Sequence, residues 1–545
     1  MESWDVVVIG DGPAALRAAI AADEAGAATL IISEGGSGNT GVGIPENAIA
    51  ASLKETTTKG HRDDTIRTGE WLNDQDIVSA RTAAAGGVMS ELERWGVIFR
   101  RDAEGLPQSF PGPGHGTSRV SGCGDATARE VQNALEERCL RNRIARRGEC
   151  LPLDLVVVDS AVRGVLILDQ SHGRVDAIHS KAVVIADAGH EGAWNGGACG
   201  GTGQAMAARA GIKLRDLEFQ SWSPLCVKGT DLTLPTGLIS NGAVMMSPSG
   251  DEISPDSGTT PTDLARALVE AGDGCVLDAR KIKGDAREWY AHTISLLKSR
   301  TGLDMTEDVI PIEPRVAGTI GGIPIDEHGR AVHGEWGRWL SGLYAAGDAA
   351  SSGLHGAEMA WGNRLLDDLT GGKAAGAHAG EWSLNAQTTG VEKVADRRDE
   401  MEAALNERLL VGGEGPQTGR IRRDLQKTIS EGVGLLRKSE SLEAAVTGLA
   451  DLRSDAENFS VSTPGLLLNL ELVEGLKLQN TCMLAHMSAA AASTRDESRG
   501  SHQRTDNPDR SESWMKHSLT DADGHVSTLP VRMSSAGTWI LAPES

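Results

Sequence analysis

Aromatic side chains are scarce in this 545-residue chain, and basic residues are outnumbered. Phe, Trp and Tyr together make up 3% of the sequence. The chain has 53 Lys and Arg against 76 Asp and Glu, which gives a formal net charge of -23. A protein that binds nucleic acid normally presents a basic face, so this balance argues against that class. Surface charge of one sign keeps a protein dispersed in solution.

The chain has few cysteines, and no two of them form a CxxC pair. Local zinc and iron–sulfur motifs are therefore missing, and we expect no metal site. An odd number of scattered thiols is typical of reduced cysteines in a cytoplasmic protein. The seven are Cys123, Cys139, Cys150, Cys199, Cys226, Cys275 and Cys482.

Long apolar runs are also missing, because no segment approaches the ~18 apolar residues that span a bilayer. The chain enters a strand-like segment at once, and we therefore expect no signal peptide. These features favour a cytoplasmic protein that reaches the inner face of a membrane only through partner subunits.

Hydrophobic residues make up 39% of the chain, which is enough for a sizeable core. At roughly 100–200 residues per domain, the length indicates two to four domains. The 67 glycines favour tight turns and close backbone contacts, as in α/β nucleotide-binding proteins.

The first forty residues have the pattern of a βαβ unit. The apolar run Trp4–Ile9 predicts a buried parallel strand, and a helix is predicted over residues 14–25, ending at Gly26. Ala28–Ser33 predicts the second strand. The whole unit is close to the ~30 residues that such units take.

A glycine-rich turn, Gly10 to Ala15, joins the first strand to the helix. Gly10 allows the tight turn, Gly12 lets the backbone approach a pyrophosphate, and Ala15 permits close helix–strand packing. Glu34, at the end of the second strand, is placed to bind a ribose hydroxyl. The alternative is a glycine turn that serves packing alone. The N-terminal position of the unit favours FAD over NAD.

Several later segments resemble the succinate dehydrogenase/fumarate reductase flavoprotein family, which also includes L-aspartate oxidase. The resemblance covers nearly the whole chain in order, and its helical and C-terminal parts favour the subunits that form complexes. The segments that carry it are Gly69–Asp76, Ser118-Arg119 with Asp125–Thr127, Leu217–Phe219, Gly321–Pro324, Gly347–Ala350, Leu354–Ala357, Gly362–Asp367, Leu478–Asn480, Glu497–His502 and Trp514–His517.

The resemblance implies an α/β FAD-binding Rossmann-like domain with an inserted α+β capping domain, then a C-terminal helical domain and an extended tail. We expect the FAD-binding domain over residues 1–235 and 313–370 and the capping domain over 236–312. The helical domain is expected over 371–495 and the C-terminal extension over 496–545.

The resemblance also implies which residues contact FAD. Asp348 stands where the family has Glu, Thr202 where it has Asp, and Arg364 where it has Ser. Asn39 stands where the family often has a His that tethers FAD covalently, so we expect non-covalent FAD. A flavin without the tether suits reduction of a substrate better than oxidation of succinate. The expected contacts are Gly10, Gly12, Pro13, Ala14, Ala15, Ser33, Glu34, Asn39, Thr40, Gly41, Ala188, Gly189, Thr202, Gly347, Asp348, Asn363, Arg364 and Leu365.

The family's dicarboxylate site is altered. That chemistry needs groups that hold two carboxylates and an acid or base that moves a proton while a hydride is transferred with the flavin. By the resemblance, each ligand position now holds a residue of another kind. These residues are Ser223, Leu225, Thr236, Ala317 and, in place of the Arg of the HGANR motif, Met359.

A few candidates for substrate chemistry remain. Arg266 matches the family's proton-transferring Arg, although an Arg on a solvated helix face is the alternative. Arg315 and Arg364 could rebuild an anion site, or be surface charges or neighbours of the flavin phosphates. His355 has either a catalytic or a structural role. We expect Arg266 and His355 to be catalytic. The residues expected to bind the substrate are Arg315, Thr236 and Gly362.

The resemblance therefore implies an FAD-dependent oxidoreductase. It would pass electrons between a small dicarboxylate-type substrate and a separate iron–sulfur subunit of a membrane-associated complex. Because the dicarboxylate ligands are replaced, two alternatives stay open. One is a flavoenzyme of the same fold with another substrate, and the other is a flavin-binding subunit without catalysis.

Overall fold

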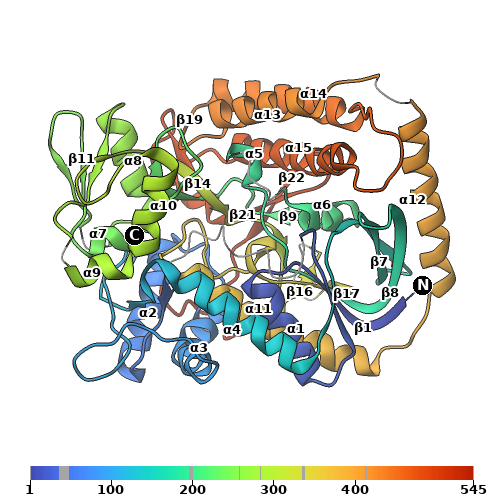
Figure 1. The fold of residues 1–545 in the computed structure, drawn as a ribbon, viewed down its shortest axis with the longest axis horizontal. Coiled ribbons are helices and arrows are strands. Elements are labelled where there is room, and N and C mark those ends of the chain that lie inside the picture. The colour runs from blue at the N-terminus through green and yellow to red at the C-terminus, as the bar shows by residue number, and fades with distance from the viewer. Residues whose placement is uncertain are drawn as a thin grey trace.

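A computed structural model describes residues 2–35, 48–195, 200–256, 258–282, 284–333, 338–411 and 414–543 (Figure 1). Asn39, Thr40 and Gly41, three of the expected FAD contacts, lie outside these ranges.

The central element is an eight-stranded sheet with the order β16-β17-β7-β8-β1-β2-β5, in which β6 pairs with β7. β1 runs parallel to both β2 and β8, which confirms the βαβ unit predicted at the N-terminus. The strands are β1 (Glu2–Ile9), β2 (Thr29–Ile32), β5 (Ala145–Arg147), β6 (Cys150–Val158), β7 (Ala161–Asp169), β8 (Arg174–Ile185), β16 (Arg330–Val332) and β17 (Trp339–Ala345).

Helices cover both faces of this sheet. Val6 and Val8 of β1 pack with one group of helices, whereas Val7 and Ile9 pack with α6 and α15 (Leu470–Thr494) on the other face. This alternation follows from the period of two along a strand. The first group is α1 (Pro13–Glu24), α3 (Gln75–Arg94), α4 (Thr127–Asn142) and α11 (Asn363–Asn385); α2 (Glu55–Thr68) precedes α3, and α6 covers Thr202–Arg209.

The helices α1 and α11 pack unusually closely. A Cβ atom on Gly372 of α11 would lie 2.4 Å from the Ala14 carbonyl oxygen, and one on Gly376 would lie 2.0 Å from the Ala18 carbonyl oxygen. Only glycine fits at these two positions. The two helices therefore run parallel, with the first turn of α1 beside the middle of α11 and the N-terminus of α11 extending beyond that of α1.

A second, five-stranded antiparallel sheet has the order β10-β14-β13-β11-β12 and forms a lobe with α7 to α10, at the left of Figure 1. All of β10 and most of β14 lie outside the range expected for the capping domain, 236–312. The elements are β10 (Gln220–Val227), α7 (Gly237–Ser240), β11 (Val244–Met246), β12 (Glu252–Ile253), α8 (Pro261–Ala271), β13 (Val276–Asp278), α9 (Gly284–Trp289), α10 (Ala291–Thr301) and β14 (Ile310–Thr319).

The C-terminal part is mainly helical, with α13, α14 and α15 packed together at the top of Figure 1. α11 runs through residue 370, where the helical domain was expected to begin. The helices are α12 (Val391–Val411), α13 (Thr418–Gly432), α14 (Ser439–Glu457) and α15 (Leu470–Thr494). No helix in the described ranges is long and apolar enough to cross a membrane.

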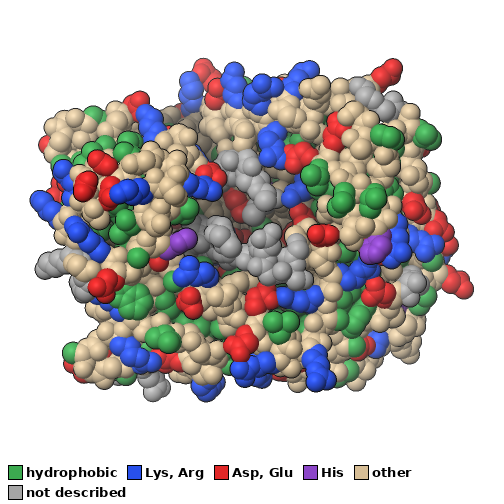
Figure 2. Space-filling view, viewed as in Figure 1, with side chains coloured by type: hydrophobic (Ala, Val, Ile, Leu, Met, Phe, Trp, Pro, Cys, Tyr) green, Lys and Arg blue, Asp and Glu red, His purple; other side chains and the backbone are tan. Residues whose placement is uncertain are grey.

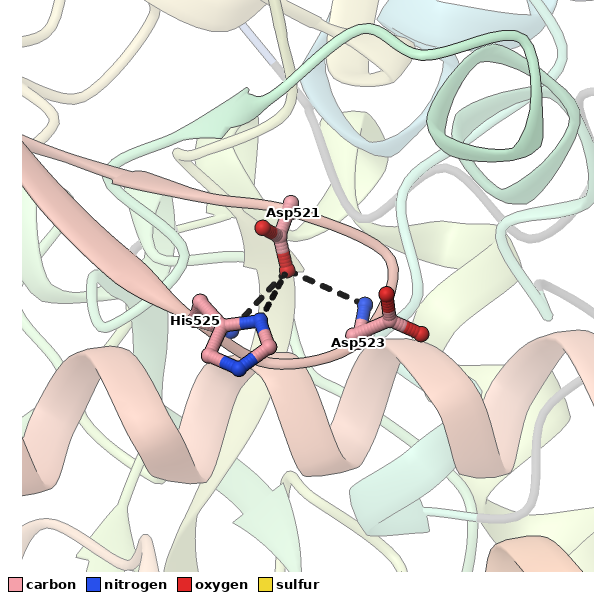
Figure 3. Close-up of side chains that lie close together, drawn as sticks. All are labelled: Asp521, Asp523 and His525. Atoms are coloured by element: carbon pink, nitrogen blue, oxygen red, sulfur yellow. Dashed lines mark hydrogen bonds and ion pairs between the residues drawn. The ribbon is translucent and has the colours of Figure 1, made fainter.

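The tail is not extended throughout, because β21 (Lys516–Thr520) and β22 (Val526–Pro530) form a hairpin that pairs with β9 (Leu214–Arg215). Its turn brings Asp521, Asp523 and His525 together (Figure 3). The Asp521 carboxylate accepts hydrogen bonds from the backbone N–H groups of Asp523 and His525, at 3.1 and 2.9 Å. Turn formation accounts for this exposed cluster.

Buried charges anchor the tail to the core. Arg495 is 0% exposed, and its guanidinium donates to Glu218 at 2.6 Å and to Glu497 at 2.9 Å. Glu218 also accepts a hydrogen bond from the Ser518 hydroxyl of β21 at 2.6 Å. The remaining short elements are β3 (Ile49–Ala50), β4 (Val120–Ser121), α5 (Gly192–Asn195), β15 (Ile323–Pro324), β18 (Ala350–Ser351), β19 (Leu436–Arg437) and β20 (Gln503–Arg504).

Candidate functional site

The turn between β1 and α1 is shaped for a phosphate group. Gly10 has a φ of +118°, and a Cβ atom there would lie 2.3 Å from the Ala186 carbonyl oxygen. Gly12 caps α1 without a side-chain hydrogen bond, and the first turn of the helix, which begins Pro13-Ala14-Ala15, has no acidic residue. The first N–H groups of α1 and the positive end of its dipole therefore remain available for an anion.

Space for a ligand lies directly at this turn. Apart from its chain neighbours, no described residue has a heavy atom within 4 Å of the position that a Gly12 Cβ atom would take. This open approach, together with the uncapped helix, fits the pyrophosphate of FAD.

Glu34, at the end of β2, has two partners from distant parts of the chain. Its carboxylate accepts a hydrogen bond from the Thr202 hydroxyl at 3.2 Å and forms an ion pair with the Lys477 ammonium group at 2.6 Å. The Ser33 hydroxyl donates to the Gly35 carbonyl oxygen instead. Thr202 can donate to Glu34 where an Asp would repel it, which gives the substitution a physical reason. The role of Lys477 was not predicted.

Ala188 and Gly189 follow β8, and the Thr319 hydroxyl lies directly over Gly189. Just before them, the Asp187 carboxylate accepts a hydrogen bond from the Gly203 N–H group at 2.8 Å. Thr202 and this part of the chain therefore lie on one side of the nucleotide turn, as expected for FAD contacts.

Asp348 and Arg364 form an ion pair with each other. The Arg364 Nε atom donates to Asp348 Oδ1 at 3.0 Å, and Nη1 donates to the Ala317 carbonyl oxygen at 3.2 Å. Gly347 packs against Ala14 of α1. The charge of Arg364 is thus neutralised by Asp348, which weakens the hypothesis that Arg364 rebuilds an anion site.

The start of α11 is a second uncapped helix N-terminus. Gly362 is its N-cap residue and makes no side-chain hydrogen bond. The Asn363 side chain donates to the Thr65 hydroxyl at 3.0 Å and bonds to the His61 Nε2 atom at 2.9 Å. Asn363 and the fully buried Leu365 therefore offer a cofactor their backbone rather than their side chains.

His355 is buried, at 8% exposure, and Asp367 orients its ring. The Nε2 atom lies 3.5 Å from Asp367 Oδ2, while Nδ1 has no hydrogen-bond partner among the residues that the structure describes. Burial raises the pKa of the Asp367 carboxyl, but His355, Arg81 and Ser352 together hold that pKa below its usual value. A histidine oriented by a carboxylate, with its other nitrogen unengaged, is suited to proton exchange.

Arg266 lies on α8 and is partly exposed, at 39% of its side chain. It pairs with Asp263 at 3.1 Å and Glu270 at 3.8 Å, and donates to the Gln503 side chain at 3.3 Å. Within the described ranges, no hydrogen bond or ion pair joins Arg266 to His355. This environment fits the alternative of an arginine on a helix face.

The three expected substrate-binding residues are not all brought together. Gly362 and Thr236 lie near each other, because their sequence neighbours Trp361 and Gly237 are in contact. A Cβ atom on Gly237 would lie 3.2 Å from the Trp361 ring. A small recess forms there; its aromatic lining is Phe110, Trp289, Tyr290 and Trp361. Arg315 lies instead on β14, opposite Ser223 of β10, and pairs with Glu313 at 3.0 Å.

Sequence reasoning missed Glu358, which is only 1% exposed. Burial raises the pKa of its carboxyl to about 8, so that the acid is mainly uncharged at neutral pH. The signal was present in the sequence, because an acidic residue immediately precedes Met359, where the family's HGANR motif has Asn and then Arg.

On the face seen in Figure 2, the surface is hollowed near its centre, and side chains of both charges are scattered over it. No single-sign patch dominates this face.

Comparison with known proteins gives a consistent result. The family model described as "FAD binding domain" matches residues 5–365, and "Fumarate reductase flavoprotein C-term" matches residues 422–542. A succinate dehydrogenase flavoprotein subunit from Rickettsia conorii is 28% identical, with 95% of this chain and 93% of that protein covered. A fumarate reductase flavoprotein subunit from Haemophilus influenzae is 29% identical, with 94% and 91% covered.

Solved structures agree with these matches. A FrdA variant of the E. coli quinol fumarate reductase superposes with a TM-score of 0.90 at 26% identity, with 100% of this chain and 99% of that chain covered. These matches confirm the FAD-binding fold with a fumarate reductase-type C-terminal part.

Proposed function

The chain belongs to the succinate dehydrogenase/fumarate reductase flavoprotein family, and on that premise we propose that it exchanges electrons between a small carboxylate-bearing substrate and FAD, and passes them to or from an iron–sulfur partner subunit. FAD-dependent oxidoreductase chemistry is what this family provides. What we propose beyond family membership is the class of substrate and the iron–sulfur partner subunit.

One observation carries the proposal: a cradle suited to FAD lies beside a histidine that is ready to exchange a proton. The uncapped N-termini of α1 and α11 face the same end of this parallel helix pair, and His355 precedes α11 by eight residues, with no partner for Nδ1 among the described residues. Bound FAD would supply hydride transfer. The α1 N-terminus would hold its pyrophosphate, and the positive end of α11 would stabilise negative charge on the ring system.

The residues on the substrate side have a separate task. His355, oriented by Asp367, would move the proton that accompanies hydride transfer. Arg266 is the cation that the resemblance retains, and rearrangement of its ion pairs with Asp263 and Glu270 would free it to bind one carboxylate. The replaced ligands leave no equivalent group for a second carboxylate at Met359.

The flavin is proposed to be non-covalent, because Asn39 has no nucleophilic ring nitrogen to form the tether. An iron–sulfur partner is proposed because the relatives are named as flavoprotein subunits and this chain has no CxxC motif of its own.

Anaerobic addition of succinate to the flavin-loaded protein tests the proposal, with the flavin's visible absorption band as the readout. Bleaching that is lost in Arg266→Ala, but kept in the exposed-arginine control Arg174→Ala, supports a carboxylate site at α8. Loss in Arg315→Ala would place that site on β14 instead.

The contrary result is a flavin that dithionite reduces, that succinate does not reduce and that fumarate does not reoxidise. A plain dicarboxylate substrate would then be excluded. A flavin-binding subunit without catalysis would be favoured if other small carboxylic acids failed too.

A further inference from the structure

Glu34 is held by two side chains that come from distant parts of the chain. The Thr202 hydroxyl donates to its Oε1 atom at 3.2 Å, and the Lys477 ammonium group donates to its Oε2 atom at 2.6 Å. A carboxylate can accept about four hydrogen bonds, so about two remain. Two are enough for the hydroxyl groups of a ribose, which is the ligand expected at the end of β2.

The ion pair joins two parts of the molecule. Glu34 follows β2 of the nucleotide-binding unit, whereas Lys477 lies on α15 of the helical part. The Lys477 side chain is 18% exposed and that of Glu34 is 32% exposed, so the pair is partly shielded from solvent. Salt screens such a pair less than a pair on the open surface.

α15 is tied to the segment that leads to Thr202. The Thr481 hydroxyl, one turn after Lys477, donates to the Lys477 carbonyl oxygen at 2.9 Å and to the Gly200 carbonyl oxygen at 3.3 Å. A Cβ atom on Gly200 would lie 2.7 Å from this hydroxyl, so a side chain there would push α15 away. Lys477 and Thr202 therefore reach Glu34 from two segments that are held together.

A second acid lies near Glu34. Burial raises the pKa of the Asp187 carboxyl to about 6, and the charge of Glu34 acts in the same direction, against hydrogen bonds from the N–H groups of Gly203 and Ala188. Asp187 is therefore mainly ionised at pH 7. Among the residues that the structure describes, Lys477 is the one cation that forms an ion pair with Glu34.

Negative charge at this position opposes the binding of a dinucleotide. The Gly10 N–H group donates to the Ile32 carbonyl oxygen at 2.8 Å, so the turn expected to hold the pyrophosphate lies beside the end of β2. Like charges repel each other over roughly a Debye length, ~10 Å at 0.1 M salt. A cation on Glu34 offsets that repulsion and leaves two acceptor positions for the ribose.

We propose that Lys477 is a positioning residue of the FAD site, which acts through Glu34 by neutralising its charge and orienting its carboxylate. The helical part of the chain then completes a cofactor site that the nucleotide-binding unit begins. This inference rests on the FAD binding that the proposed function requires, and on neither the substrate nor the iron–sulfur partner.

The FAD affinity of the full chain tests this role. It is measured from the fluorescence of the flavin released when the loaded protein is serially diluted. Lys477→Met should weaken FAD binding roughly tenfold or more, because the charge of Glu34 is left uncompensated. Lys477→Arg keeps the cation and should retain the affinity. The matched control is Lys298→Met, because Lys298 is 62% exposed and also pairs with an acid, Asp304, at 2.8 Å.

A double variant shows whether Lys477 acts through Glu34. Glu34→Gln removes the charge and keeps an acceptor for the ribose. In that background Lys477→Met should change FAD affinity by about twofold or less, the scatter seen for independent sites. ADP carries the ribose and the pyrophosphate without the flavin, so its competition with FAD should show that Lys477→Met weakens both ligands by the same factor. Thermal midpoints show whether each variant is folded.

Wild-type FAD affinity in Lys477→Met, a loss of equal size with and without Glu34→Gln, or a loss of FAD affinity with unchanged ADP affinity would overturn the positioning role. The two proposals can fail separately. Weakened FAD binding in Lys477→Met, with a wild-type flavin that no small carboxylic acid reduces, would leave the role of Lys477 standing and sink the redox role. Reduction by succinate, with unchanged FAD affinity in Lys477→Met, would do the reverse.

Discussion

The uncharged state of buried Glu358 can be tested through protein stability, independently of any substrate. In the unfolded chain the pKa of this carboxyl is about 4.5, whereas burial raises the folded-state pKa to about 8. Between these values the unfolded state loses its proton and the folded state keeps it. The contribution of Glu358 to stability is therefore complete below pH 4.5, falls as pH rises, and levels off above pH 8.

The size of the effect follows from the two pKa values. Linkage gives a loss of about 3 to 4 kcal/mol between pH 5 and pH 8, as an upper estimate for one group. For a chain of 545 residues, the entropy of unfolding is roughly 1.1 kcal/mol per degree, so the thermal midpoint should change by about 3 °C.

Glu358→Gln removes the titration while it keeps the shape of the side chain. Relative to wild type, the thermal midpoint of Glu358→Gln should therefore rise by about 3 °C between pH 5 and pH 8. Differential scanning fluorimetry across this range measures it. The exposed Glu440, whose side chain is 85% exposed, supplies the matched control Glu440→Gln. Curves for wild type and Glu358→Gln that stay parallel at every pH would refute the reasoning.

Three further predictions concern the cofactor and the core. Gly10→Ala should abolish FAD binding, because the new Cβ atom would lie 2.3 Å from the Ala186 carbonyl oxygen. The flavin-to-protein ratio after purification measures this, and a ratio equal to that of the wild type would contradict it. Acid precipitation should release all of the flavin into the supernatant, because Asn39 cannot tether it, and yellow colour that stays with the pellet would show a covalent bond. Arg495→Met should lower stability by about 3 to 5 kcal/mol, because Glu218 would be left as a buried carboxylate without an ion-pair partner, and Glu497 would keep only Arg499. The matched control is the exposed Arg174→Met, and equal thermal midpoints for the two variants would disprove the anchoring role.

Local sequence patterns predicted the nucleotide-binding half of the fold well. The run Trp4–Ile9 and the glycine turn after it became β1 and the start of α1, since strand pattern, turn and helix agree over a short stretch. The sequence pattern of Thr262–Ala271 also predicts a helix, and these residues form most of α8, which begins with a capping box of Thr260 and Asp263.

Contacts between distant segments could not be predicted in this way. The ion pair between Glu34 and Lys477 joins residues 443 positions apart, and no local pattern indicates it. The continuation of α11 past residue 370 follows from its packing on α1, and the hairpin in the tail follows from pairing with β9. In both cases tertiary contacts decide where the element lies.

The substrate side shows the same limit. The motif match named Arg266 but could not reveal that Asp263, Glu270 and Gln503 surround it. Glu358 was visible as a departure from a motif, yet only its burial shows that its carboxyl is mainly uncharged at neutral pH.

Single-turnover reduction of the flavin by a panel of small carboxylic acids, in the wild type and in His355→Asn, tests the central claim most directly. The account predicts that at least one small carboxylic acid bleaches the flavin anaerobically in the wild type. The rate should fall by a factor of 10² to 10⁴ in His355→Asn, the range typical of a lost general acid or base, while flavin content is unchanged. A wild-type flavin that dithionite reduces but no acid in the panel reduces, or equal rates in the two proteins, would contradict it.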